Sequence, residues 1–376
     1  MKAVVAIDSF KGSLSSVEAG MAAKEGILKA CGDAEVVVKP LADGGEGTTE
    51  ALVEGMNGRY VEIEVTGPMG ATTAARYGIV GNGTTAVMEM AEASGIILVK
   101  REDLNPWKAS TTGVGEMIID AIERGCREFI IGIGGSATTE GGIGMLHALG
   151  YRFYDAAGEV LPPVFESLGK IERISSEHVR EELKECHFQV ACDVTNPLCG
   201  ENGAIYVFGP QKGVRMEEKK FMDGAMGHYA VKTTEFTGKD NSHKEGAGAA
   251  GGLGFAFLSY LPNTELKSGI SIVLEAIGLE DELKDADVVV TGEGRLDFQT
   301  AMGKVPVGVA RLAKKYGCKV VAFAGSVTEE AGKCNEEGID AFFPIVRGVT
   351  TLEEAMDPET AKKNMALSAE QVFRLL

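Results

Sequence analysis

Short runs of β-branched residues, each followed at once by charged residues and glycine, constrain the fold of this chain more than any other feature. The run "KAVVAI" over residues 2–7 leads into Asp8, and the run "VVV" over residues 288–290 leads into "TGEGRLD". Apolar runs of this length are typical of strands buried on both faces, as in a parallel sheet. Because open α/β sheets bind ligands at the carboxyl ends of their strands, charge in these positions indicates a site.

Helical patterns alternate with such strands at both ends of the chain. Ser15 and Glu18 have the spacing of a capping box, which predicts a helix that runs to about Cys31. A second strand follows within "AEVVVKP" and leads into a glycine-rich loop. From residue 287 onward the same alternation repeats, and a helix near 359–375 ends the chain. This rhythm predicts the α/β class.

The middle of the chain has a different sequence pattern. The segments "TTAARYGIV" (72–80) and "TTAVMEMAEASG" (84–95) predict antiparallel strands that lead to a helix, and residues 211–248 form the most polar stretch. With 376 residues, the chain has the length of two domains at roughly 100–200 residues each. We therefore expect two α/β domains and a cleft lined by loops at strand ends.

Charge and cysteine usage limit the partners and the compartment. The formal net charge of −18 argues against nucleic acid or an anionic membrane as the main partner. The seven cysteines include no C-x-x-C pair, which favours reduced thiols over disulfides or a zinc site. The N-terminal "MKAVVAIDSF" turns polar too soon for a signal peptide, and no apolar run approaches the ~18 residues of a membrane span. We expect a cytoplasmic protein, either a monomer or a homodimer.

The segment "GIGGSATTEGG" (132–142) is the first of two glycine-rich loops. It lies between a predicted strand and a predicted helix, where backbone amides and the positive end of the helix can bind an anion. A tight turn that needs glycine only for steric reasons is the alternative. We predict that the loop binds the phosphates of a cofactor, through Gly134, Gly135, Ser136, Ala137 and Thr138.

The same loop also fits the G-x-G-x-x-A pattern of dinucleotide folds, with Asp155 about twenty residues beyond it. This pattern leaves open an NAD(P)-dependent oxidoreductase that acts on a small hydroxy acid. Thr139 and Glu140 argue against it, because they put polar bulk and a negative charge beside the expected diphosphate.

The second glycine-rich loop, "EGAGAAGGLG" (245–254), also contains G-x-G-x-x-G, but no predicted strand precedes it. Two interpretations remain open for Gly248, Gly251 and Gly252. They can form a backbone cradle for part of a nucleotide, or they can allow close packing of the chain.

Acids and bases gather behind the predicted strands. No Walker A sequence, H-E-x-x-H pair or G-x-S-x-G elbow accompanies them, and the five histidines are dispersed. A single cluster could be an ion pair or a turn cap, but four clusters together with anion-binding loops indicate phosphoryl transfer. The clusters are Asp8, Ser9 and Lys11; Asp43 and Glu46; Asp193 and Asn196; and Glu293, Arg295 and Asp297.

Several long strings together resemble the glycerate kinases of the first, bacterial type. They run from residue 1 to about residue 350: "AIDSFKGSLSS", "PLADGGEGT", "GIGGSAT", "ACDVTNPLCGENGA", "FGPQKG", "GAGAAGGLG" and "DADVVVTGEGRLDFQTAMGKVPVGVA". The resemblance implies phosphorylation of D-glycerate by ATP with Mg²⁺, in most members at the 2-hydroxyl to give 2-phosphoglycerate. One departure is visible, because the family's loop usually reads "GGSATND" where this chain has Thr139 and Glu140.

The resemblance also implies a discontinuous architecture with the site in the cleft. Residues 1–70 plus 287–376 would form a Rossmann-type, flavodoxin-like domain. Residues 71–286 would form an inserted α/β domain of restriction-endonuclease-like topology. Both ends of the chain show the βα rhythm and the middle does not, which agrees with this division.

Residue roles follow as predictions. We expect Asp193 to be the general base, and Lys11 and Arg295 to bind the glycerate carboxylate or the transferring γ-phosphoryl group. Glu293 and Asp297 are the expected metal ligands. The expected substrate-binding residues are Asp8, Ser9, Asp43, Glu46, Asn196 and Lys212. A non-catalytic binding protein for a small organic acid is a third hypothesis, which binding without ATP turnover would favour.

Overall fold

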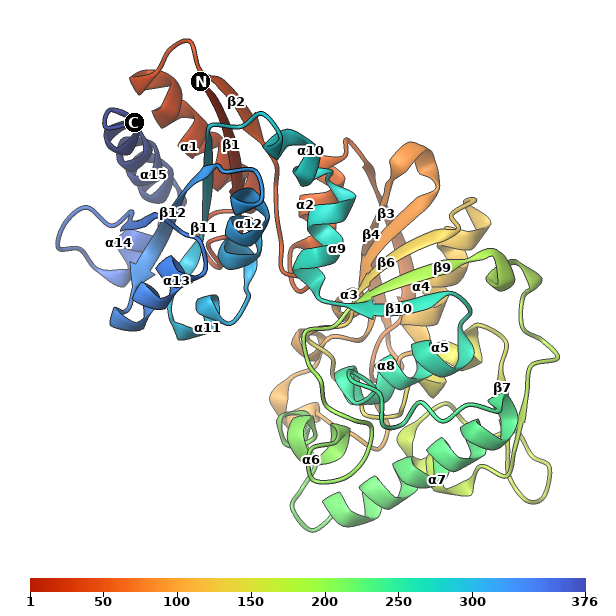
Figure 1. Ribbon diagram of the computed structural model, residues 1–376. Coiled ribbons are helices and arrows are strands. Elements are labelled where there is room, and N and C mark those ends of the chain that lie inside the picture. The colour runs from red at the N-terminus through yellow and green to blue at the C-terminus, as the bar shows by residue number, and fades with distance from the viewer. The chain divides into compact units, whose positions relative to one another are not determined.

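The computed structural model describes residues 1–376, apart from the side chain of Asn82. The chain forms two compact units, each with its own large sheet (Figure 1). The first unit comprises residues 1–43, 50–57 and 270–376, and the second comprises residues 44–49 and 58–269. The domain boundaries expected after residues 70 and 286 stay predictions beside this division.

The first unit is built on a five-stranded sheet in which all neighbours are parallel. The order β13-β12-β11-β1-β2, read from its other edge and numbered along the chain, is 2-1-3-4-5, the order of flavodoxin-like sheets. The winding reverses between β1 and β11, where Ile7 pairs with Gly292. The strands are β1 (Lys2–Ile7), β2 (Glu35–Val38), β11 (Val288–Leu296), β12 (Lys319–Val327) and β13 (Ala341–Pro344).

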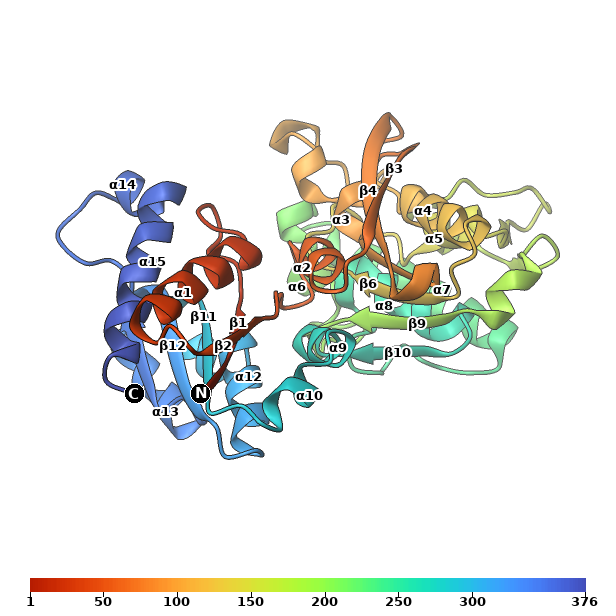
Figure 2. The same ribbon diagram turned by 90° about the horizontal axis from the view of Figure 1, so that it is seen from above.

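Helices cover both faces of this sheet (Figures 1 and 2). On one face α1 and α15 pack so closely that a side-chain carbon on Gly26 would lie 2.0 Å from the carbonyl oxygen of Ala366. Helix α12 lies on the other face, beside β11 and β12. The helices, two of which begin just outside this unit, are α1 (Ser16–Ala30), α2 (Thr48–Gly55), α9 (Gly269–Ala276), α10 (Leu279–Leu283), α11 (Phe298–Ala301), α12 (Val305–Lys314), α13 (Lys333–Glu336), α14 (Leu352–Met356) and α15 (Pro358–Phe373).

The predicted capping box at the start of α1 is confirmed. The Ser15 hydroxyl accepts a hydrogen bond from the amide of Glu18 at 3.2 Å, and the Ser15 amide donates to the Glu18 carboxylate at 3.0 Å. These two bonds satisfy amides that the first turn of a helix leaves without partners. The helix then buries Ala19, Ala23 and Ile27 against the sheet. This packing fixes the loop between β1 and α1, which carries Asp8 and Lys11.

The second unit is built on a mixed six-stranded sheet, β10-β9-β6-β5-β4-β3. The first four strands are parallel, and β5, β4 and β3 are antiparallel, so the predicted antiparallel pair is confirmed. These strands are β3 (Arg59–Thr66), β4 (Thr72–Val80), β5 (Thr85–Glu89), β6 (Glu128–Gly132), β9 (His187–Ala191) and β10 (Thr264–Lys267). A two-stranded sheet contains β7 (Arg152–Tyr154) and β8 (Arg173–Ser175).

The helices of the second unit pack on its sheet around a large apolar core. This core contains the stacked rings of Phe129 and Phe188, on the neighbouring strands β6 and β9. The parallel sheet of the first unit and the parallel strands of the second confirm the predicted α/β class, whereas the restriction-endonuclease-like topology stays a prediction. The helices are α3 (Met90–Ser94), α4 (Thr112–Glu123), α5 (Ile143–Ala148), α6 (Ala204–Phe208), α7 (Lys219–Thr237) and α8 (Ala249–Tyr260).

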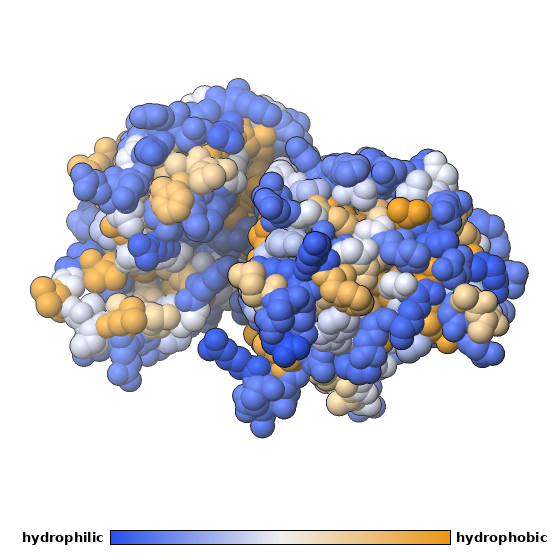
Figure 3. Space-filling view, turned by 90° about the horizontal axis from the view of Figure 1, so that it is seen from below, coloured by the Kyte–Doolittle hydropathy of each residue, from blue (hydrophilic) through white to orange (hydrophobic). Residues whose placement is uncertain are grey.

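The surface and the cysteines agree with the composition. The face shown in Figure 3 is mainly hydrophilic, with hydrophobic residues in small groups. All seven cysteines are free thiols. Among the described residues, no helix combines the length and the apolar character that a membrane crossing requires.

Candidate functional site

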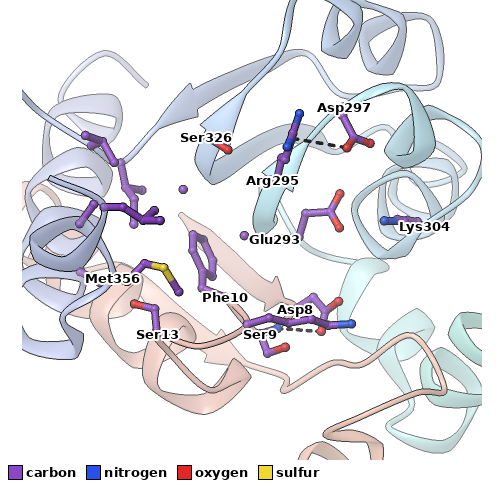
Figure 4. A pocket seen from close by; sticks show the side chains of 18 of the residues that line it. Asp8, Ser9, Phe10, Ser13, Glu293, Arg295, Asp297, Lys304, Ser326 and Met356 are labelled. Atoms are coloured by element: carbon purple, nitrogen blue, oxygen red, sulfur yellow. Dashed lines mark hydrogen bonds and ion pairs between the residues drawn. The ribbon is translucent and has the colours of Figure 1, made fainter. Parts of the chain in front are cut away.

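A cavity of about 480 Å³ lies in the first unit, where the winding of its sheet reverses (Figure 4). Parallel sheets bind ligands at this position, because the loops behind the two central strands diverge there. The strand pairing brings Asp8, directly after β1, close to Glu293 in β11. The cavity collects seven residues that the sequence pattern selected: Asp8, Ser9, Lys11, Asp43, Glu293, Arg295 and Asp297.

Two carboxylates in this cavity are almost completely buried. Asp8 is 5% exposed and Glu293 is 8% exposed. Burial, together with repulsion from Asp43 and Glu293, raises the pKa of Asp8 to about 7, although the Ser9 amide donates to this carboxylate at 2.7 Å. Burial also raises the pKa of Glu293, which accepts a hydrogen bond from the Thr300 hydroxyl at 2.5 Å. A cation or a proton is needed to make this cluster favourable, because like charges in a desolvated site repel each other.

Basic side chains line the same cavity. Lys11, Arg295 and Lys304 provide three cations beside the acids, and Figure 4 shows Glu293 and Lys304 pointing toward each other. Arg295 is largely exposed, with its Nε 3.6 Å from a carboxylate oxygen of Asp297. The sequence patterns did not select Lys304. Its position directly before a helix that carries proline in its first turn was the available signal, because proline is common in the first turn of a helix and so marks the residue before it as the start.

Asp297 is the N-cap of helix α11. Its carboxylate accepts a hydrogen bond from the Gln299 amide at 2.9 Å and so caps α11. Its own amide donates to the Thr300 hydroxyl, which in turn donates to Glu293. Asp297 therefore positions Glu293 through Thr300, and a role for Asp297 as a metal ligand stays a prediction.

The second unit places several other predicted residues just beyond the carboxyl ends of its own parallel strands. Gly134 and Gly135 follow β6 and are exposed, and Asp193, two residues beyond β9, is also exposed. One Asp193 carboxylate oxygen accepts a hydrogen bond from the Gly269 amide at 3.1 Å. Gly44 packs tightly here, since a side-chain carbon on it would lie 2.6 Å from the Cα atom of Gly269. Glu46 follows in an exposed turn of the same loop.

Lys212 supports the first glycine loop from within the second unit. The side chain is buried, and its Nζ donates to the Ser136 hydroxyl and to the Thr138 carbonyl oxygen, each at 2.6 Å. Burial lowers the pKa of Lys212 to about 7, against the attraction of Glu140. Ser136, Ala137 and Thr138 are buried as well, so the exposed backbone of the predicted cradle is at Gly134 and Gly135. Contact of Lys212 with substrate stays a prediction.

The two residues that depart from the family's loop face the interior. The Thr139 hydroxyl donates to the Pro106 carbonyl oxygen at 3.0 Å. Glu140 is fully buried, and one of its carboxylate oxygens accepts hydrogen bonds from the amides of Thr111 and Gly144 and from the Thr111 hydroxyl. Thr139 and Glu140 thus fasten the loop to its surroundings.

The second glycine loop is packed against backbone. A side-chain carbon on Gly251 would lie 2.1 Å from the Thr138 carbonyl oxygen, and one on Gly248 would lie 2.2 Å from that of Pro197. Gly251 and Gly252 also have φ values of +69° and +91°, which favour glycine. This geometry supports the close-packing interpretation, whereas contact with phosphate stays a prediction.

Asn196 lies beside the second glycine loop and is hydrogen-bonded to backbone. Its side-chain amide donates to the Asn202 carbonyl oxygen at 2.8 Å, and its own carbonyl oxygen accepts a hydrogen bond from the Gly248 amide at 2.9 Å. Asn196 therefore connects the loop after β9 to the second glycine loop. Substrate binding by Asn196 stays a prediction.

The acids of the first unit have the chemistry of a magnesium site. Mg²⁺ takes oxygen ligands and is usually held by one or two carboxylates together with phosphate oxygens and water. Asp8, Asp43 and Glu293 offer such oxygens, and their mutual repulsion favours a cation. Within the described part of the chain, no three acidic, histidine or cysteine side chains converge closely enough to hold a metal alone. The residues thus fit a metal that arrives with a phosphate ligand.

Comparison with known proteins gives one consistent result. The model of the glycerate kinase family matches residues 3–376. The chain is 44% identical to the glycerate kinase of Haemophilus influenzae, covering 100% of this chain and 99% of that one. It is 45% identical to the glycerate 2-kinase of Escherichia coli, covering 95% of this chain and 93% of that one. A crystal structure of a Salmonella typhimurium LT2 protein, described as a candidate glycerate kinase 2, has a TM-score of 0.92 at 43% identity and covers 100% of this chain and 98% of that one.

Proposed function

The chain belongs to the glycerate kinase family, and from this premise we propose that it transfers the γ-phosphoryl group of ATP to the 2-hydroxyl of D-glycerate, with Mg²⁺, to give 2-phosphoglycerate. The name of the Escherichia coli relative, glycerate 2-kinase, supports the choice of hydroxyl. The alternative, an NAD(P)-dependent oxidoreductase, finds no support among these relatives.

The observation that carries the proposal is the cavity at the reversal of the first sheet, with buried acids beside three cations. Phosphoryl transfer requires positioning and charge neutralisation more than covalent chemistry by the protein. Lys11, Arg295 and Lys304 can neutralise phosphate oxygens, and the Arg295 guanidinium offers two parallel donors to a carboxylate or a phosphate.

The buried acids would hold Mg²⁺. Asp8, Asp43 and Glu293 are the proposed ligands, and Glu293 is oriented by the hydrogen bond from Thr300. The metal, when bound, neutralises charge on the phosphate oxygens. Because the pKa of Asp8 lies at about 7, this side chain would be ionised, and so able to hold the metal, only from about neutral pH upward.

Asp193 is the proposed general base, which accepts the proton of the attacking hydroxyl. The Gly269 amide fixes the carboxylate by its hydrogen bond at 3.1 Å, and the side chain is exposed to an incoming substrate. Asp8 is the second candidate, because a pKa of about 7 matches the operating pH of a general base.

A coupled assay of ADP release tests the proposal. We expect release that requires both D-glycerate and Mg²⁺, and no change in the absorbance of added NAD(P). Asp193→Asn should lower kcat by at least about 100-fold if Asp193 is the base, since base catalysis contributes about 10²–10⁴. If Asp193→Asn retains more than about a tenth of the activity, Asp193 is not the base.

A further inference from the structure

The cavity of the first unit has two ends of different chemistry. One end carries the acids and cations described above. The other end is apolar, and Figure 4 shows Phe10 and Met356 on the opposite side of the cavity from Lys304. The apolar lining comes from the loop after β1, the segment after β13, and helices α14 and α15: Phe10, Ile345, Val346, Leu352, Ala355, Met356 and Ala361.

Glycerate does not account for the apolar end. Every carbon of this small acid carries oxygen, so it offers no apolar face, and burying its hydroxyls against Phe10 and Met356 would cost free energy. Of the two substrates in the proposed reaction, the nucleotide alone has a flat apolar part. Sites for such ligands are clefts of about 300–1,000 Å³ with a mainly apolar lining and a few polar groups, and the volume of about 480 Å³ falls in this range.

We propose that the apolar end binds the purine base of ATP and that the polar end holds its phosphates. This inference rests on the proposed function, because it assigns one substrate of that reaction to the first unit. Phe10, Leu352 and Met356 contact the faces of the purine ring. Lys11, Arg295 and Lys304 then lie toward the phosphates, together with the acids that hold the metal.

Exposed apolar surface at the rim supports this assignment. Leu352 lines the cavity, yet the residue is 76% exposed, so an aromatic base that covers it removes apolar surface from water. Met356 reaches across the loop that carries Lys11, since a side-chain carbon on Gly12 would lie 2.8 Å from the Met356 Cε atom. The apolar end and the cationic end are therefore adjacent.

Hydroxyl groups are available for the polar atoms of the base and the ribose. Ser13 lines the cavity near Met356 in Figure 4, and its hydroxyl has no hydrogen-bond partner among the described residues. Ser326 lines the same cavity from the end of β12 and is exposed. A buried polar group without a hydrogen-bond partner is unfavourable. A ligand that supplies an acceptor or a donor would therefore give the Ser13 hydroxyl its missing hydrogen bond.

Two substitutions that keep side-chain volume test the proposal. Leu352→Asn and Met356→Gln keep the approximate side-chain volume and remove the apolar contact. Val349→Asn is the matched control, because Val349 is fully exposed, lies in the loop before α14 and does not line the cavity. We expect the KM for ATP to rise about tenfold in Leu352→Asn and Met356→Gln. The KM for D-glycerate should change less than twofold, and Val349→Asn should leave both constants unchanged.

Calorimetric titration separates the base from the phosphates. ADP should bind about tenfold more weakly to Leu352→Asn and Met356→Gln than to the wild type, whereas tripolyphosphate should bind equally well. A rise in the KM for D-glycerate instead of ATP would overturn the inference, as would equal losses for ADP and tripolyphosphate. Absence of turnover in the wild type would count against the proposed function alone, since the ADP titration still reports where the base binds.

Discussion

Replacing Asp8 by asparagine should make the first unit less sensitive to rising pH. The asparagine can still accept the hydrogen bond that the Ser9 amide donates at 2.7 Å, but it carries no charge. In the wild type, burial and neighbouring acids raise the pKa of Asp8 from 3.8 to about 7. Between these two values the folded state holds a proton that the unfolded chain has lost, so the free energy of unfolding falls as the pH rises.

The size of the loss in unfolding free energy follows from the pH range between the two pKa values of Asp8. One unit of pKa difference corresponds to ~1.4 kcal/mol, and the range from pH 5 to pH 7 contains about two units. Above about pH 8 Asp8 is ionised in both states, and its contribution is constant. We therefore expect the wild type to lose ~2–3 kcal/mol more stability than Asp8→Asn between pH 5 and pH 8.

Hydrogen exchange of the β1 amides is the appropriate assay, because it reports the opening of the unit that contains Asp8. Fluorescence would be uninformative here, since the single tryptophan, Trp107, lies in the other unit. Asp33→Asn changes an exposed aspartate of the same unit and should behave like the wild type. Equal losses of protection in the wild type and in Asp8→Asn would show that Asp8 is not protonated near neutral pH, and would refute the reasoning.

Three further predictions follow from the same geometry. Lys212→Met removes both hydrogen bonds from Nζ to the first glycine loop and should destabilise the second unit by ~1–3 kcal/mol, seen as a lower urea midpoint of Trp107 fluorescence; an unchanged midpoint would contradict the supporting role. Gly251→Ala should cost ~3 kcal/mol or more, because its side chain would meet a backbone carbonyl, whereas Gly158→Ala, with positive φ but open space, should cost ~1–2 kcal/mol; equal losses of thermal stability would contradict this account. The apparent affinity for Mg²⁺ in the presence of ATP should rise about tenfold from pH 6 to pH 8 and then level off, and Asp8→Asn should abolish this dependence; a flat wild-type profile would exclude Asp8 as a ligand.

The sequence pattern was sufficient for the fold class. It also identified the acidic residues of the cavity and two of its three basic residues. Charge behind the apolar runs at 2–7 and 288–290 pointed to Asp8, Lys11, Glu293 and Arg295. Parallel pairing of β1 and β11 brings the four residues into one cavity. Such a prediction succeeds because neighbouring parallel strands end at the same edge of a sheet, whatever the length of chain between them.

The local pattern could not separate binding residues from supporting ones. Lys212 and Gly251 stand in polar, glycine-rich segments, as exposed ligand contacts often do, yet both are buried beneath the first glycine loop. Burial of this kind depends on segments far apart in the sequence. The apolar end of the cavity was missed for the same reason, because Phe10 and Met356 are separated by almost the whole chain.

The most direct test of the central claim is the identity of the product. Purified protein with D-glycerate, ATP and Mg²⁺ should convert ATP to ADP, and ³¹P NMR should show 2-phosphoglycerate as the new phosphate ester. A signal from 3-phosphoglycerate would contradict the proposed position of transfer. No phosphorylated glycerate at all, from folded protein supplied with Mg²⁺, would contradict the proposed phosphoryl transfer itself.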